Sequence, residues 1–209
     1  MTNKLLLSML AAGFLAINVC AKEIPFEDRP IAAIMPFAYH VDEYPQYEKN
    51  ISGIADALAV DLLKTNKIRL VERSRVDTVL KEITLGQTGI IDAAKASQAG
   101  KQLGAQQVIL GSIVALSIRE EGRSVKIAEK TTRWVEIEAE ARLVDVETGE
   151  LLAAGKASNK VSSAEKHAFG GKIGKLATPE SLVQQALEGL GEKLAKDLAK
   201  NIRPLPKKK

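Results

Sequence analysis

Histidine and cysteine, two side chains that often carry catalysis, are few in this 209-residue chain. Its two histidines, His40 and His167, fall in predicted loops, with no cysteine or other metal-ligand spacing nearby. No serine stands in the G-x-S-x-G pattern of a hydrolase nucleophile. The sequence therefore predicts no catalytic, cofactor-binding or metal-binding residue and indicates a protein that is not an enzyme.

Two further patterns resemble binding sites, but each lacks a defining part. Residues 170–175 read GGKIGK, without the G-x-x-x-x-G-K-[ST] spacing of a phosphate loop, and predict a flexible loop before a helix. Glu136, Glu138 and Glu140 alternate along a predicted strand and form its solvated face. A calcium site would need a loop of Asp and Gly residues there, which the sequence does not supply.

Residues 1–21 have the pattern of a secretory signal peptide. Lys4 precedes an apolar run over residues 5–17, which is shorter than the roughly 20 apolar residues of a membrane-spanning helix. Small side chains close the leader, so cleavage is predicted between Ala21 and Lys22. The predicted location is the periplasm, with peripheral association with the outer membrane left open.

Cys20 is the only cysteine and offers a second interpretation of the leader. A lipoprotein leader ends in a cysteine that follows a small residue and receives lipid, and Asn18 and Val19 fit that pattern badly. If cleavage follows Ala21, the mature chain has no thiol and forms neither a disulfide nor a thiolate metal site.

Charge and composition argue against two more classes of protein. The formal net charge of +4 is carried by the chain ends, because Lys4 lies in the leader and Lys207, Lys208 and Lys209 end the chain. The rest is neutral, which argues against a DNA-binding face, and 4% aromatic residues argue against a stacking platform for single-stranded nucleic acid. The basic tail, residues 204–209, is interpreted as a solvated end or as a weak tether to an anionic partner such as lipid headgroups.

Hydrophobic spacing predicts that strands and helices alternate in the first half of the chain. Apolar runs predict strands over residues 31–35, 68–71 and 107–116. Helical spacing predicts three helices, which cover residues 51–65, begin at Ser74, and cover residues 93–103. In the second helix, Asp77 stands three residues after Ser74 and forms a near capping box with it.

The second half predicts a hairpin and a final helix. Strict alternation from Trp134 onward predicts a strand with one wet face in an antiparallel part of the sheet, and residues 151–161 return as its partner. Residues 117–132 are highly charged, residues 162–178 read as a loose polar loop, and a helix is predicted from Pro179. The fold class is α/β (α+β), a single layer of mixed or antiparallel sheet with about four helices.

Several pieces of the chain, in a fixed order, resemble the CsgG family of curli-type secretion and assembly proteins. They are IMPF (34–37), LLKTNKIRL (62–70), LVERSRVDTVLKEITLGQTGIID (70–92), KQLGAQQVILGSI (101–113) and ARLVDVETGELLAA (141–154). The resemblance covers nearly all of the mature chain. It implies a periplasmic domain, assigned to residues 22–203, that assembles into rings.

Seven residues in these pieces are interpreted as structural, because each suits a turn or an element end. They are Glu72 and Arg73 between a strand and the next helix, Gly89 and Asp92 at the turn into the third helix, Gly104 at its end, Gly111 inside a strand and Gly149 in a hairpin turn.

In the curli member of the family, two amphipathic hairpins per subunit form a membrane pore. A membrane strand needs about 9 to 11 residues with an apolar lipid-facing side. The first corresponding place, residues 117–133, is charged on both alternate faces, and the second, residues 162–178, is polar and short. The sequence therefore predicts a family member without pore-forming hairpins or a transmembrane segment.

Two functions remain. The first is a non-enzymatic periplasmic component of an envelope assembly or secretion system that acts by protein–protein contact as a homo-oligomer. The alternative is a regulatory partner of a peptidoglycan synthase, similar to the LpoB lipoprotein. Both predict protein partners in the cell envelope, no nucleic acid and no cofactor.

Overall fold

The computed structural model describes residues 24–84, 93–125, 128–168 and 171–205. In these residues, four α-helices and two short 3-10 helices accompany one sheet. The helices are η1 Phe26–Asp28, η2 Pro45–Ile51, α1 Ser52–Lys64, α2 Arg73–Thr84, α3 Ala93–Leu103 and α4 Pro179–Ala199. The strands are β1 Ile31–Ile34, β2 Ala38–Tyr39, β3 Arg69–Leu70, β4 Gln107–Val125, β5 Ala128–Asp145, β6 Leu151–Ala168 and β7 Gly171–Ile173.

The strand order is β3-β1-β4-β5-β6-β7, with β2 also paired to β4. The short strands β1, β2 and β3 are joined by parallel pairings, whereas β4 through β7 pair antiparallel. The predicted fold class, a mixed sheet with four helices, is therefore confirmed. The prediction that the strand with one wet face lies in an antiparallel region is confirmed as well.

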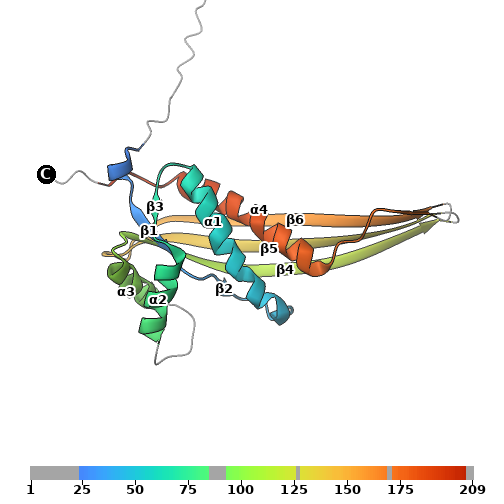
Figure 1. The fold of residues 1–209 in the computed structure, drawn as a ribbon, viewed down its shortest axis with the longest axis horizontal. Helices are drawn as coiled ribbons and strands as arrows, with labels where there is room; N and C mark the ends of the chain where they lie inside the picture. The colour runs from blue at the N-terminus through green and yellow to red at the C-terminus, as the bar shows by residue number, and fades with distance from the viewer. Residues whose placement is uncertain (1–23, 85–92, 126–127, 169–170, 206–209) are drawn as a thin grey trace, which may run out of the picture.

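Helices cover both faces of one end of the sheet (Figure 1). α1 and α4 lie across one face, and α2 and α3 lie on the other beside β1. Neighbouring residues of β4 belong to different cores, since Ile109 packs with the α1 and α4 side chains and Val108 with those of α2 and α3. Because successive side chains of a strand point to opposite faces of the sheet, β4 packs against a helical layer on each face.

The alternating pattern of β5 explains how α4 is held. The apolar side chains of Val135, Ile137 and Leu143 are at most 2% exposed and share one cluster with the α4 leucines. Burial of each such side chain stabilises the folded state by roughly 1.5–3 kcal/mol. The glutamates between them face the other side of the sheet, and none of the described β5 residues from Val135 to Leu143 belongs to the core beneath α2 and α3.

The three long strands differ from the prediction at their far ends. β4 continues to Val125 and β5 begins at Ala128, so the charged residues 117–132 are largely strand. The predicted loop over residues 162–178 is wrong for residues 162–168 and 171–173, which belong to β6 and β7, whereas residues 174–178 lie outside any helix or strand as predicted. Ladder hydrogen bonds join backbone groups, so they form without the apolar side chains on which the prediction relied.

Several predictions fall on residues that the structure does not describe. The leader, with Cys20 and the cleavage site at Ala21 and Lys22, lies outside the described residues, as do Gly89 and Asp92. Among the helices that are described, none combines the length and the hydropathy that crossing a bilayer requires.

Candidate functional site on the sheet arm

The far ends of the long strands form an arm that extends beyond the helices (Figure 1). We define the arm as residues 117–125 of β4, 128–134 of β5 and 162–168 of β6, together with β7. The β4 residues from Arg119 to Val125 are all exposed. Ile118, at the base of the arm, still packs against the core that α4 covers, but no buried core residue lies in the other described residues of the arm. Their surface is therefore available for contact with other molecules.

Strand pairing holds the arm together from end to end. β5 pairs with β4 from Ser117↔Glu136 to Val125↔Ala128 without a register shift. β5 pairs with β6 on its other side as far as Ala128↔Ala168. The arm is therefore a continuous three-stranded ribbon with β7 added at its end.

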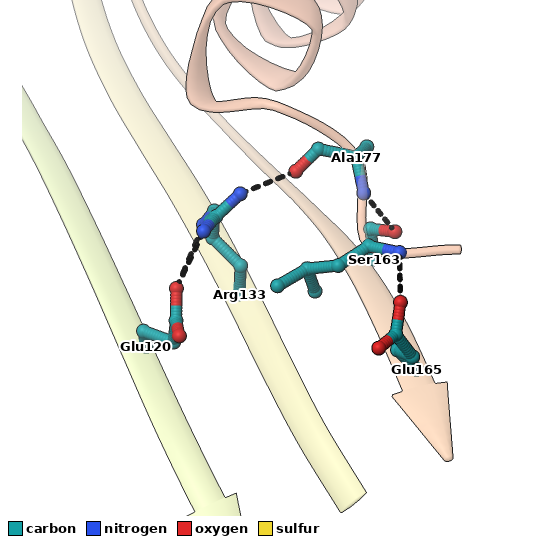
Figure 2. Close-up of polar contacts among 6 residues, drawn as sticks. Glu120, Arg133, Ser163, Glu165 and Ala177 are labelled. Atoms are coloured by element: carbon teal, nitrogen blue, oxygen red, sulfur yellow. Dashed lines mark hydrogen bonds and ion pairs between the residues drawn. The ribbon is translucent and has the colours of Figure 1, made fainter. Parts of the chain in front are cut away.

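Arg133 fixes the base of the arm on the face that leads to α4 (Figure 2). Its Nε and Nη2 atoms donate to Oε2 of Glu120 at 3.0 and 2.7 Å, and its Nη1 donates to the Ala177 carbonyl at 2.6 Å. The Ala177 amide in turn donates to Oγ of Ser163 at 2.9 Å. One guanidinium thus joins β4, β5 and the segment that returns to α4.

Glu165 holds the returning segment farther along the arm. Its carboxylate contacts Lys172 Nζ and His167 Nε2 at 2.8 Å each and accepts from the Leu176 amide at 3.2 Å. The hydrogen bond from Lys172 is the largest cause, followed by that of His167, of a Glu165 pKa lowered to about 2. The carboxylate is consequently ionised at neutral pH and binds β7 back onto β6.

The two long edges of the arm differ in what covers them. Beyond its pairing with β2 at Ser112 and Ile113, β4 has no strand on its outer side in the described residues, from Ala115 to Val125. β6 pairs with β7 only at its last three residues. Nearer the body, Lys193 of α4 donates to the Ser158 carbonyl of β6 at 2.5 Å. In the described residues, β4 is thus an edge without a strand neighbour from Ala115 to the end of the arm, and β6 gains its outer neighbour, β7, only at Lys166–Ala168.

Comparison with known proteins identifies the family. The family model described as "Curli production assembly/transport component CsgG" matches residues 25–204. The chain belongs to the CsgG family. Comparison with curated proteins gives no match.

Three solved structures are similar to this CsgG-family chain. Lipoprotein GNA1162 from Neisseria meningitidis is 16% identical and covers 64% of this chain and 84% of its own, with a TM-score of 0.47. The hypothetical protein CT253 from Chlamydia trachomatis is 10% identical, covering 83% and 98%, with a TM-score of 0.45. A putative neuraminyllactose-binding hemagglutinin homolog from Helicobacter pylori is 12% identical, covering 87% and 89%, with a TM-score of 0.48.

The Glu72–Arg73 pair of the CsgG-like sequence lies at the start of α2. Oε2 of Glu72 accepts hydrogen bonds from the Ser74 hydroxyl and from the Arg75 amide, the latter at 3.3 Å. These bonds, with that of Ser74 the largest cause, lower the Glu72 pKa. The helix therefore begins at Arg73 with Glu72 as its cap, and Ser74 is not its first residue. Arg73 forms an i,i+4 pair with Asp77 at 3.1 Å.

Three glycines of the CsgG-like sequence lie in the described residues, and they are required for different structural reasons. Gly111 lies under Phe37, and a Cβ atom there would come within 2.3 Å of the ring. Gly104 and Gly149 have φ angles of +67° and +73°, the left-handed region that glycine adopts most easily. The first glycine allows close packing, and the other two allow the chain to turn.

The face of the sheet opposite Arg133 carries a ladder of ion pairs, and we call it the outer face. Lys156 of β6 lies 3.2 Å from Glu138 and 3.6 Å from Glu140 of β5. Lys160 lies 3.9 Å from Glu136, with its Nζ 6.0 Å from the centre of the Trp134 ring. All three glutamates therefore face lysines of the next strand.

The histidines and the GGKIGK segment do not form a common site. His40 is exposed just after β2. His167 lies in β6, so its predicted loop position is wrong, and Lys172 of GGKIGK lies in β7, so the flexible-loop prediction is wrong there. Among the residues that the structure describes, no three His, Cys, Asp or Glu side chains are grouped closely enough to hold a metal ion.

Proposed function

We propose that this protein is a non-enzymatic component of a cell-envelope assembly or secretion system and acts by protein–protein contact. Its membership of the CsgG family supports this proposal, because the description of that family names a component of curli assembly and transport. The proposed location is the periplasm, after removal of residues 1–21 as a leader.

The observation that carries the proposal is the uncovered β4 edge from Ala115 to Val125. An edge strand presents a row of backbone N–H and C=O groups that pair readily with another chain. Natural proteins commonly shorten or cover such edges, whereas this one extends away from the body (Figure 1). We infer that the partner of the β4 edge is a second copy of the chain.

The arm has the geometry needed for repeated association. One edge of the arm is β4, and the opposite edge is β6 with β7. The two edges present different backbone and side-chain groups. Contact between unlike edges joins copies head to tail and leaves a free edge on the last copy. Such a series closes into a ring when the rotation between copies permits.

Paired proline substitutions test the use of this edge. In an antiparallel pair, successive N–H groups of one strand point alternately toward the partner and away from it. Of Glu121→Pro and Gly122→Pro, one removes an N–H that bonds to β5 and the other an N–H that faces outward. Thermal unfolding distinguishes them, because only the first breaks the pairing within the arm.

Light scattering of the chain from Lys22 onward then gives the decisive masses. We expect the mass of the wild type to be a multiple of the single-chain mass. We expect a smaller mass for the proline variant whose thermal stability is unchanged. An unchanged mass for that variant contradicts pairing through β4. A wild type that is monomeric at every concentration favours the alternative, a regulatory partner of a peptidoglycan synthase.

A further inference from the structure

Three cations stand side by side across the outer face of the arm. The registers pair Arg123 of β4 with Lys130 of β5, and Lys130 with Lys166 of β6. Directly opposed residues on neighbouring strands project from the same face, and all three side chains are exposed. Like charges in this arrangement destabilise a sheet, so the row needs an explanation.

Neighbouring carboxylates neutralise only part of this row. Oε1 of Glu121 lies 2.9 Å from Nε of Arg123. Lys130 and Lys166 have no ion pair within the described residues, and Glu129 and Glu165 project from the opposite face, where Glu165 binds Lys172. Two unpaired cations and one paired cation therefore form a positive strip.

The next row outward on the same face is apolar. It consists of Val125, Ala128, Ala168 and Gly171, which are in register across the four strands. Val125 is 68% exposed, and Ile173, opposite Lys166, is 65% exposed. Nothing in the described part of the chain covers these two side chains, because the helices lie at the other end of the sheet (Figure 1).

We propose that this end of the outer face docks on an anionic phospholipid bilayer. Val125 lies one row beyond the cations, and Ile173 lies at the end of the cationic row beside Lys166. Apolar side chains next to a band of Lys and Arg match the boundary between acyl chains and phosphate headgroups at a membrane surface. Val125 and Ile173 enter the interface, and the three cations contact lipid phosphates. This surface is a face of the arm, distinct from the β4 edge that the proposed function uses.

A soluble polyanion fits the observations less well than a lipid surface does. Phosphates along such a polymer would neutralise Arg123, Lys130 and Lys166 but would leave Val125 and Ile173 exposed. A bilayer satisfies the cationic row and the apolar row together. The two sources of phosphate are therefore distinguished by the contribution of the apolar side chains.

Vesicle binding of the chain from Lys22 onward tests the proposal, since every described element lies within residues 24–205. The probes are vesicles of phosphatidylcholine alone and vesicles with equal parts of phosphatidylcholine and phosphatidylglycerol. The test variant combines Arg123→Gln, Lys130→Gln and Lys166→Gln. It removes a repulsive row, so we expect its thermal stability to equal or exceed that of the wild type.

A matched control removes the same charge from the same face nearer the body. It combines Arg142→Gln, Lys156→Gln and Lys160→Gln, which are exposed in β5 and β6. Both triple variants keep the lysine tail, so differences between them come from the sheet. At about 1 kcal/mol for each basic residue near an anionic membrane, we expect on the order of 100-fold weaker binding for the test variant. We expect less than a threefold change for the control.

Further measurements separate lipid docking from simple charge attraction. We expect the wild type to bind the anionic vesicles and not the neutral ones, and Val125→Ser with Ile173→Ser to weaken that binding by roughly tenfold or more. The proposal would be overturned if the wild type bound both kinds of vesicle equally, or if the two triple variants lost binding equally. It would also be overturned if the serine variant bound anionic vesicles as strongly as the wild type does and bound soluble polyphosphate tightly. Each outcome is independent of whether copies associate through β4.

Discussion

Arg133 and Glu120 form a two-point contact between neighbouring strands at the base of the arm, with N···O distances of 3.0 and 2.7 Å. The Arg133 side chain is 19% exposed, and its remaining donor reaches the Ala177 carbonyl. A single side chain thus connects the arm to the segment that leads into α4 (Figure 2).

Arg133→Ala should loosen this connection. The substitution leaves the Ala177 carbonyl and Glu120 without their charged donor, and we expect the free energy of unfolding to fall by about 1–2 kcal/mol. Urea denaturation measures the change, and hydrogen exchange should accelerate in residues 128–134. Arg119→Ala on the outer face is the control. An effect there as large as that of Arg133→Ala would contradict the assigned role.

Gly111→Ala should be destabilising because of Phe37. The added Cβ would lie 2.3 Å from the ring, so ring or backbone must shift, at a cost of about 1–3 kcal/mol. Gly122→Ala is the control, because a Cβ there meets nothing within 4 Å. Chemical denaturation should show that Phe37→Leu reduces the effect of Gly111→Ala. Fully additive effects would exclude the contact as the cause.

Glu165 should make the stability of the arm sensitive to acid. Its pKa falls from the ordinary value of 4.5 to about 2, chiefly through Lys172 and then His167. A lowered folded-state pKa contributes stability above the unfolded value and loses it as the pH falls through the folded value. We therefore expect Glu165→Gln to unfold at a lower temperature than wild type at neutral pH. The difference should shrink between about pH 5 and pH 2.

Thermal unfolding across this pH range measures the effect, with Glu129→Gln on the same arm as the control. A difference between wild type and Glu165→Gln that stays constant with pH would rule out the ionised carboxylate as the source. The same result for both variants would assign the effect to net charge.

The sequence predicted the elements whose side chains alternate or recur against a core. The pattern from Val135 to Leu143 indicated a strand with one wet face, and α3 was predicted with the bounds that the structure has. Such elements are predictable because burial leaves a periodic trace in the sequence.

The strands of the arm are not predictable in this way, because polar and charged side chains occupy both of their faces. Residues 117–132 show no apolar period, and their order comes from backbone pairing with partners distant in the chain. Contacts such as that of Phe37 with Gly111 were equally hidden, since nothing local marks a side chain that will lie on a glycine more than seventy residues later. The start of α2 was displaced because Glu72 serves as its cap.

Hydrogen exchange of the outward-facing β4 amides between Ala115 and Val125 tests the central claim most directly. In a single copy these amides face solvent and exchange quickly, whereas pairing with a second copy protects them. The account predicts that their protection increases with protein concentration while that of the β5 amides stays unchanged. Fast exchange at every concentration, in a sample whose mass exceeds that of one chain, would show that association uses another surface.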